Sequence, residues 1–520
     1  MTATEATDVP PAPAVPHEAL SPAEERFERW RKVAGFVLAP IAFAFILLTD
    51  FPTLSPQAHR LAGVMAAVVI LWITEALPLP VTALAAASVC VLLRVAPAGD
   101  VFAPFADPLI FLFIGAFITA RAIFIHGLDR RFAFAVLSMK GVGARPGRIL
   151  FAFGAITAFL SAWIANTAAT AMMFAIGMSI LAFLFEQQGK GGVPIGRRYA
   201  TGLMLMTAFA ASIGGLATPI GTVPNVVGLA YIRTQVGVEF PFFKWCVIGV
   251  PIVVMLYLWL AAYLNYLCRA ETDEIPGAAE MIARERARMG AWTTSQVSTL
   301  IAFGLTVALW VIPGLIALVW GETSIPYKRA TEIMPEGVAA LLGALLLFLL
   351  PGRFGGEGGG GRAMTWDEAV KIDWGVVLLY GGGFALGVLS FKTGLARAVG
   401  EGLTGMLPVQ GSEFGMLVAA TTIAMLVSET TSNTASANMV VPVVIALSKA
   451  ADVDPLMPAL GATFGASLGF MLPVSTPCNA IVYGSGYIPI GRMMRYGFLL
   501  DVVGVVVVIG MVRLLVPLLR

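Results

Sequence analysis

Long apolar stretches with very few charged side chains dominate the hydrophobic pattern of this chain. The clearest of them are residues 33–48, 108–120, 149–164, 338–350 and 502–512. Membrane helices are continuously apolar in this way, whereas the strands of a membrane barrel alternate apolar and polar residues with a period of two. The pattern therefore predicts an all-α polytopic membrane protein.

Polar residues interrupt the apolar pattern at two related places. Asn166-Thr167 lies inside residues 163–172, and Asn433-Thr434 lies inside residues 430–439. An amide or hydroxyl without a partner costs several kcal/mol in a bilayer, so such residues have partners or a function. Taken singly, each pair is explained as well by hydrogen bonds between helices. Taken together, they predict a site near the middle of the membrane for a small anion and its coupling cations.

Two further segments combine residues that cannot continue a helix. Residues 214–225 contain three glycines and two prolines, and residues 472–480 contain Pro473 and Pro477. Helices broken there expose backbone N–H groups, which suit carboxylate oxygens, and C=O groups, which suit a hard cation such as sodium. One break can therefore serve an anion and a cation together.

The polar landmarks recur in the same order in two halves of the chain. Residues 111–117 correspond to 378–384, Asn166-Thr167 to Asn433-Thr434, and 222–225 to 476–479. The first two landmarks share an offset of about 267 residues. This predicts two inverted-topology repeats with re-entrant hairpins and broken helices. Residues 106–121, apolar and glycine-bearing, are a candidate for one such hairpin.

The repeat also sets the expected domain organisation. We expect a disordered cytoplasmic tail (1–32), a first half with repeat 1 (33–268), an amphipathic linker (269–292) and a second half with repeat 2 (293–520). Basic residues just before position 33 place the amino terminus in the cytoplasm by the positive-inside tendency. The expected location is the cytoplasmic, or inner, membrane. Glu75, at the end of an apolar stretch, is expected to be an interfacial carboxylate that caps a neighbouring helix or pairs with an arginine, and a direct role in transport is the alternative.

Composition supports the membrane assignment and narrows the chemistry. Hydrophobic residues make up 58% of the chain and charged residues 12%, and the mean hydropathy is +0.86. The net charge of +2 gives no indication of a nucleic-acid partner. The four cysteines and three histidines lack ligand spacing, so neither a disulfide nor a transition-metal site is expected.

An enzyme is a weak alternative. Residues 465–469 match the GxSxG pattern with Ser467 in the nucleophile position, but they continue an apolar helical stretch with no strand before them. We therefore expect no catalytic residue.

These motifs together resemble the divalent anion:sodium symporter family, which includes bacterial dicarboxylate transporters and eukaryotic dicarboxylate, citrate and sulfate relatives. The resemblance rests on residues 72–80 (WITEALPLP), on Ser432-Asn433-Thr434, and on residues 469–473 leading to 476–479. It covers nearly all of the chain after the tail. It implies a homodimer in the lipid bilayer, with a scaffold part and a transport part that moves like an elevator.

The resemblance also implies roles for individual residues. The residues implied in dicarboxylate binding are Asn166, Thr167, Thr222, Asn433, Thr434, Thr476 and Pro477. Those implied in sodium binding are Ser161, Asn166 and Gly221 at one site and Ser428, Thr431, Asn433 and Ser475 at the other.

The sequence departs from the family pattern in the first motif, where Ala165 replaces a serine, and more mildly at Cys478, which replaces a second proline. The leading hypothesis is sodium-coupled symport of a C4-dicarboxylate (succinate, malate or fumarate), with Na⁺ as the coupling ion. Because Ala165 removes a hydroxyl ligand, a sodium-independent dicarboxylate or citrate exchanger is the alternative. A sulfate transporter, a passive anion channel and a membrane enzyme are further alternatives.

Overall fold

The structure, a computed structural model, describes residues 22–143, 145–189, 196–274, 277–354, 361–404 and 412–519. Residues 1–21 of the predicted disordered tail lie outside the described residues. The prediction of disorder for residues 22–32 is wrong, because these residues already belong to helix α1 (Pro22–Leu48). Pro22 suits a first helical position, and the alanine, glutamate and arginine residues that follow it are strong helix formers.

The first half of the chain is a succession of helices. After α1 come α2 (Pro56–Thr74), α3 (Leu79–Leu92), α4 (Ala98–Phe102), the 3-10 turn η1 (Ala103–Ala106), α5 (Pro108–Ile125), α6 (Leu128–Leu137), α7 (Pro146–Ser161), α8 (Asn166–Gly189), α9 (Arg197–Gly214), α10 (Val223–Tyr231), the π-helical turn η2 (Ile232–Val236) and α11 (Phe242–Leu267). Helix α12 (Ala278–Arg288) lies within the expected linker.

The second half continues in the same manner. It contains α13 (Thr294–Trp320), α14 (Ile325–Ile333), α15 (Glu336–Leu349), the short strand β1 (Pro351–Phe354), α16 (Trp366–Ala369), α17 (Trp374–Thr393), α18 (Leu395–Thr404), α19 (Glu413–Thr430), α20 (Asn433–Ala450), α21 (Leu456–Gly465), α22 (Pro477–Tyr483), α23 (Ile490–Leu515) and the 3-10 turn η3 (Val516–Leu518).

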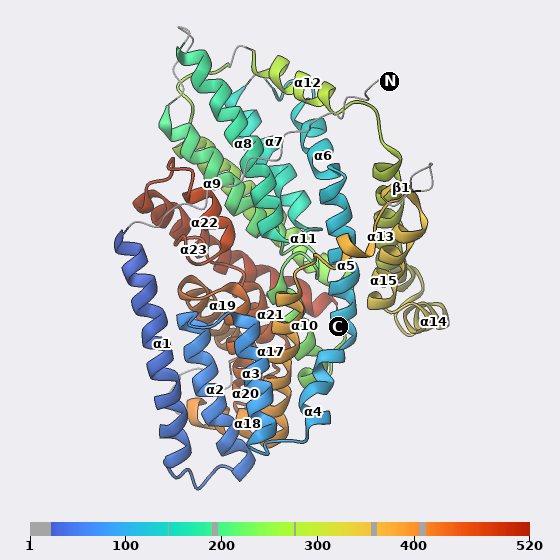
Figure 1. Cartoon of the computed structure of the whole chain (residues 1–520). Coiled ribbons are helices and arrows are strands. Elements are labelled where there is room, and N and C mark those ends of the chain that lie inside the picture. The colour runs from blue at the N-terminus through green and yellow to red at the C-terminus, as the bar shows by residue number, and fades with distance from the viewer. Residues whose placement is uncertain are drawn as a thin grey trace, which may run out of the picture.

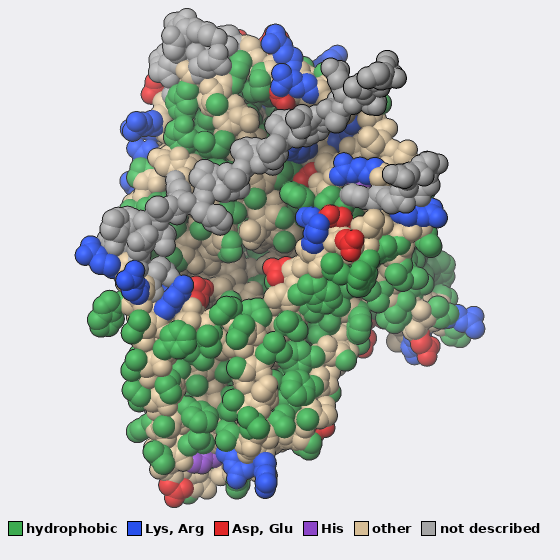
Figure 2. Space-filling view, viewed as in Figure 1, with side chains coloured by type: hydrophobic (Ala, Val, Ile, Leu, Met, Phe, Trp, Pro, Cys, Tyr) green, Lys and Arg blue, Asp and Glu red, His purple; other side chains and the backbone are tan. Residues whose placement is uncertain are grey.

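The helices have the length and composition of membrane spans. Within the described ranges, nine helices are long and apolar enough to cross a bilayer, and the bent pair α14 and α15 raises the number to ten if it counts as one span. Figure 2 shows hydrophobic side chains covering most of the lower part of one face, with charged side chains gathered at the lower edge and in the upper part. The predicted all-α membrane class is confirmed.

The expectation of a hairpin in residues 106–121 is wrong. Helix α5 runs without a break from Pro108 to Ile125. Gly115 lies inside it, and a Cβ at that position would overlap the backbone of Ala340 in α15. The glycine therefore permits close packing of two helices and does not make a turn. The expected pairing of Glu75 is confirmed, because its carboxylate lies 2.8 Å from Arg31.

The interrupted helices form two corresponding sets. Helices α7 and α8 are separated by a short turn, as are α19 and α20, while α9 and α10 are separated by an unwound segment, as are α21 and α22. Figure 1 shows α7 and α8 in the upper half of the molecule and α20 in the lower half. One large apolar core joins these elements to α11, α23 and one side of α17, whereas a smaller core joins α2, α3 and α4 to α17, α18 and the start of α20.

Candidate substrate and cation sites

The turn between α7 and α8 brings several oxygen atoms around the amide of Asn166. Ser161 ends α7, Asn166 begins α8, and the Ser161 hydroxyl lies 2.7 Å from the Asn166 amide. When the amide turns its nitrogen toward the broken helix, it donates to the carbonyls of Gly221 at 3.1 Å and Ala211 at 3.3 Å. In the opposite orientation the amide oxygen faces the Ser161 hydroxyl and the two carbonyl oxygens, and the hydroxyl supplies the one hydrogen between them. A cation bound among these oxygens would then balance their partial negative charges.

The turn between α19 and α20 repeats this arrangement. Ser428 lies near the end of α19, Asn433 begins α20, and the Ser428 hydroxyl lies 2.8 Å from the Asn433 amide oxygen. The same hydroxyl lies 2.7 Å from the carbonyl of Ala466, and the Asn433 nitrogen lies 3.5 Å from the carbonyl of Ser467. A hydroxyl has one hydrogen to donate, so this cluster also leaves oxygens facing each other.

Two asparagines hold the unwound segments in shape. The Asn225 amide nitrogen donates to the carbonyls of Gly215 at 2.9 Å and Thr218 at 2.8 Å. Asn479 does the same for its own segment, donating to Gly469 at 3.2 Å and Leu472 at 3.0 Å. Both side chains are fully buried. The carbonyls freed by the breaks therefore keep fixed directions, as a binding site requires.

Helix starts lie beside both clusters. Asn166 and Asn433 are the first residues of α8 and α20, while Thr222 and Thr476 precede α10 and α22. Such helix starts carry free N–H groups and a partial positive charge, which favour carboxylates. The Thr476 hydroxyl accepts from the backbone N–H of Asn479, whereas the Thr222 hydroxyl makes no capping bond.

The remaining predicted substrate residues differ in exposure. Thr167 and Pro477 are exposed, and Thr434 is half-buried. They follow directly on Asn166, Thr476 and Asn433 in the sequence, so they lie at the same helix starts.

Two of the predicted sodium residues turn away from Asn433. The Thr431 hydroxyl donates to the Val427 carbonyl at 2.8 Å, and the Ser475 hydroxyl lies 2.8 Å from the Glu429 carboxylate. The structure therefore brings together Ser161, Asn166 and Gly221 in the first cluster, but only Ser428 and Asn433 in the second.

Some groups of the clusters were not predicted from the sequence. Ala211, Ala466 and Ser467 contribute backbone carbonyls. Every residue has such a carbonyl, so residue type does not reveal which ones take part. Glu429 had a visible signal, because it is a carboxylate near the end of an apolar stretch. Ser467, the candidate nucleophile, is buried, and its hydroxyl has no hydrogen-bond partner among the described residues.

Helices of one half pack against those of the other. Helix α22 lies against α8 and α9. Helix α10 in turn lies against α20 and α21, where a Cβ at Gly228 would overlap Thr463. The two clusters therefore belong to a single packed unit.

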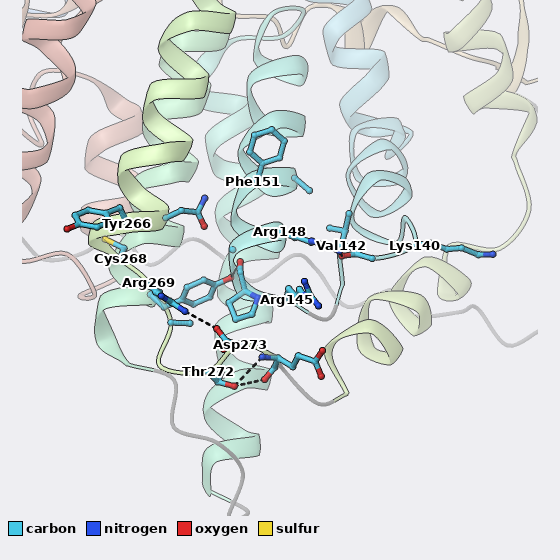
Figure 3. Close-up of a pocket in the computed structure, with 18 residues that line it drawn as sticks. Lys140, Val142, Arg145, Arg148, Phe151, Tyr266, Cys268, Arg269, Thr272 and Asp273 are labelled. Carbon is cyan, nitrogen blue, oxygen red and sulfur yellow. Dashed lines mark hydrogen bonds and ion pairs between the residues drawn. The ribbon is translucent and has the colours of Figure 1, made fainter.

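A separate cavity of about 1060 Å³ lies at the starts of α7 and α9 and the end of α11 (Figure 3). Its lining includes Lys140, Arg145, Arg148, Arg269 and Asp273 and none of the predicted site residues. Part of this charge is already paired, since Arg269 lies 3.1 Å from Asp273. The cavity is therefore not the predicted site.

Comparison of nearly the whole sequence with known proteins identifies the family. A family model described as the sodium:sulfate symporter transmembrane region matches residues 30–519. The chain belongs to this divalent anion:sodium symporter family. Among the symporters of the family, the sodium-dependent dicarboxylate transporter SdcS of Staphylococcus saprophyticus is 32% identical over 489 residues, which cover 94% of this chain and 92% of the relative. SdcS of Staphylococcus aureus strain USA300 is 30% identical over 491 residues, covering 94% and 91%.

A solved transporter structure has a similar fold. The YdaH transporter of Alcanivorax borkumensis, described as having an unusual topology, superimposes with a TM-score of 0.53 over 96% of this chain and 99% of its own. The sequence identity is 13%, so this likeness concerns the fold alone.

Proposed function

We propose that this symporter-family protein takes up C4-dicarboxylates such as succinate, malate and fumarate together with sodium ions. The observation that carries the proposal is the pair of oxygen clusters at Asn166 and Asn433, each beside a helix start and a broken helix. Two relatives about 30% identical over 94% of the chain are named sodium-dependent dicarboxylate transporters. In this assignment the helix starts hold the two carboxylates and the oxygen clusters hold sodium.

Uncharged groups suit a ligand that must be bound and released. The segments 161–167, 211–222, 428–434 and 466–477 contain a single charged residue, Glu429, and no lysine or arginine. A dianion held by amides, hydroxyls and helix starts therefore needs accompanying cations for charge balance. Sodium bound at Asn166 fixes the amide oxygen toward the cluster and the nitrogen toward the anion, which couples the two ligands.

The membrane potential gives a second reason for cations. Moving a dianion inward against about 100 mV costs roughly 4.6 kcal/mol, and two sodium ions cancel that cost. Net accumulation then needs a sodium gradient or a third cation.

We further propose an elevator movement in a homodimer of the cytoplasmic membrane, with the amino terminus in the cytoplasm. The large apolar core around the interrupted helices and the smaller core of α2, α3, α4 and α18, to both of which α17 and α20 contribute, support a transport part and a scaffold part. The inverted sets of hairpins and broken helices support alternating access around one central site.

Uptake of labelled succinate into proteoliposomes tests the function. An inward sodium gradient is expected to drive saturable accumulation, while a potassium gradient of the same size is not. Uptake that does not depend on sodium but is stimulated by succinate inside the vesicles would establish exchange instead. Exchange is the second candidate because Ala165 lacks the hydroxyl that would bind sodium. Currents that do not saturate with substrate would establish a channel.

A further inference from the structure

The cavity shown in Figure 3 lies outside both oxygen clusters, and its lining is rich in basic side chains. It measures about 1060 Å³ and lies at the starts of α7 and α9 and the end of α11. Four of the residues that line it are basic and two are acidic: Lys140, Arg145, Arg148, Arg269, Asp273 and Glu274. The cavity therefore presents more positive than negative charge to a ligand.

Most of this basic charge is not neutralised by acidic side chains. Arg269 forms an ion pair with Asp273 at 3.1 Å, in which the two side chains are 76% and 89% exposed. Such an exposed pair contributes little free energy, so a ligand can replace it. Within the described ranges, Lys140, Arg145 and Arg148 form no ion pair.

The arrangement of these groups suits a phosphate. A guanidinium group can donate two parallel hydrogen bonds to phosphate oxygens. Figure 3 shows Arg145 and Arg269 on opposite sides of Asp273. Arg148 donates to the Gly141 carbonyl at 3.0 Å, which limits the movement of its guanidinium group. No side chain caps the start of α7, which also lines the cavity, so its partial positive charge adds to that of the arginines.

The cavity lies at the end of a membrane span. Helix α11 is long and apolar enough to cross a bilayer, and residues at its end line the cavity. Tyr266, Trp259 and Met255 are exposed, and their spacing of seven and four residues places them on one face of α11. A tyrosine at the end of a span is typical of the depth of lipid headgroups. An exposed apolar surface therefore leads along α11 to the cavity.

Helix α7 adds a second apolar surface. Phe151, which lines the cavity, and Phe159, eight residues later, are both exposed. The rings of Phe151 and Tyr257 lie 5.5 Å apart, so α7 and α11 are neighbours. The apolar surfaces of the two helices therefore adjoin, and both reach the basic lining.

We propose that this cavity binds the headgroup of an anionic phospholipid. The phosphate lies among Arg145, Arg148 and Arg269, and the acyl chains follow the exposed apolar surfaces of α7 and α11. A soluble anion would use the arginines alone and leave those apolar surfaces without a role. Basic pockets between membrane helices are typical sites for anionic headgroups. The site is additional to the proposed transport function and does not depend on it.

Binding of phosphatidylglycerol to the purified full-length protein in a neutral detergent tests the site. A ligand that binds only the folded state stabilises it, so we expect phosphatidylglycerol to raise the melting temperature in a saturable manner. Phosphatidylcholine also has a phosphate but carries no net charge, and we expect little effect from it. The phosphatidylglycerol concentration for half of the full shift measures the affinity.

The decisive variants are Arg145→Gln and Arg269→Gln, which remove the charge of exposed side chains. We expect each to raise the half-saturating phosphatidylglycerol concentration about fivefold, and the double variant about 25-fold. Arg130→Gln is the matched control, because Arg130 is an exposed arginine of the preceding helix α6 that does not line the cavity. Its half-saturation is expected to stay at the wild-type value. Melting temperatures without lipid check that each variant is folded, and either single variant decides if the double variant does not fold.

Inorganic phosphate separates a lipid from a soluble anion. We expect it to stabilise the protein only at concentrations far above those of phosphatidylglycerol. Equal potency of the two would show that the occupant is a soluble anion and would overturn the lipid assignment. Equal effects of phosphatidylglycerol and phosphatidylcholine, or unchanged phosphatidylglycerol binding in the folded variants, would overturn the anionic site itself. No uptake is measured here, so a failure of sodium-driven transport and a failure of this inference remain distinct.

Discussion

The two halves of the molecule contain the same arrangement of a serine, an asparagine and a broken helix, which we call the frame. In each half a serine at or near the end of a helix faces an asparagine five residues later. The distance from the serine hydroxyl to the amide is 2.7 Å for Ser161 and Asn166 and 2.8 Å for Ser428 and Asn433. The offset between the two pairs is 267 residues. This agreement in spacing and geometry shows which groups the frame requires: a hydroxyl, an amide and the carbonyls of a broken helix.

The halves differ in what surrounds that frame. Ala162 and Ala165 in the first half stand where the second half has Glu429 and Ser432. The second half therefore has a buried carboxylate and a capping hydroxyl close to its cluster, and the first half has neither at the matching positions. The comparison separates the groups that both halves share, a serine, an asparagine and a broken helix, from the side chains that only the second half has.

The largest expected effect comes from removing the group that both halves share. Asn433→Ala and Asn166→Ala each remove an amide assigned to the anion and to a cation, so we expect succinate uptake to fall about 100-fold in either variant. Proteoliposome uptake at saturating sodium measures this. Ser467→Ala is the control and is expected to retain uptake, since its buried hydroxyl has no partner among the described residues. The opposite result, with Ser467 essential and Asn433 dispensable, would favour an enzyme.

A smaller effect separates the halves by the space around each asparagine. A Cβ at Gly215 would overlap the Asn166 amide, whereas a Cβ at Gly469 would lie 3.2 Å from Ser428 and 3.4 Å from Asn433. We expect Gly215→Ala to displace Asn166 and reduce uptake about tenfold or more, and Gly469→Ala to reduce it about twofold. Initial uptake rates of the two variants make the comparison. Equal losses would show that the two frames are not packed as described.

These examples show how far the sequence alone leads. The membrane class and the two Asn-Thr landmarks followed from residue type and spacing, because polar residues in apolar stretches are conspicuous, whereas the grouping of Ser161 with Asn166 came from the family resemblance. The failed hairpin at residues 106–121 shows the limit, since Gly115 serves helix packing and its partner Ala340 lies far away in the sequence.

The composition of the second cluster was harder to predict for a similar reason. Thr431 and Ser475 have suitable hydroxyls, but their directions depend on Val427 and Glu429. The carbonyls of Ala211 and Ala466 carry no signal in the sequence at all. Hydrogen-bond direction and backbone participation are properties of the folded chain.

The asparagines that hold the breaks predict a change in stability. Asn225→Ala and Asn479→Ala would each leave two buried carbonyls without their donor, at a cost of about 1–3 kcal/mol for an unsatisfied group. We expect a lower melting temperature in detergent for both variants, with the larger loss for Asn225, whose hydrogen bonds of 2.9 and 2.8 Å are shorter than those of Asn479. Unchanged melting temperatures would show that the breaks hold their shape without these amides.

A small gain in sodium affinity is expected when the missing hydroxyl is restored. Ala165→Ser gives the first half the residue that Ser432 provides in the second, and a hydrogen bond or ligand contact of this kind contributes about 0.5–1.5 kcal/mol. We expect the sodium concentration for half-maximal uptake to fall about two- to tenfold. Ser432→Ala is the converse variant, although it also removes the cap on the Ala435 N–H at 3.2 Å. If wild-type uptake ignored sodium and Ala165→Ser made it sodium-dependent, this one position would separate exchange from symport.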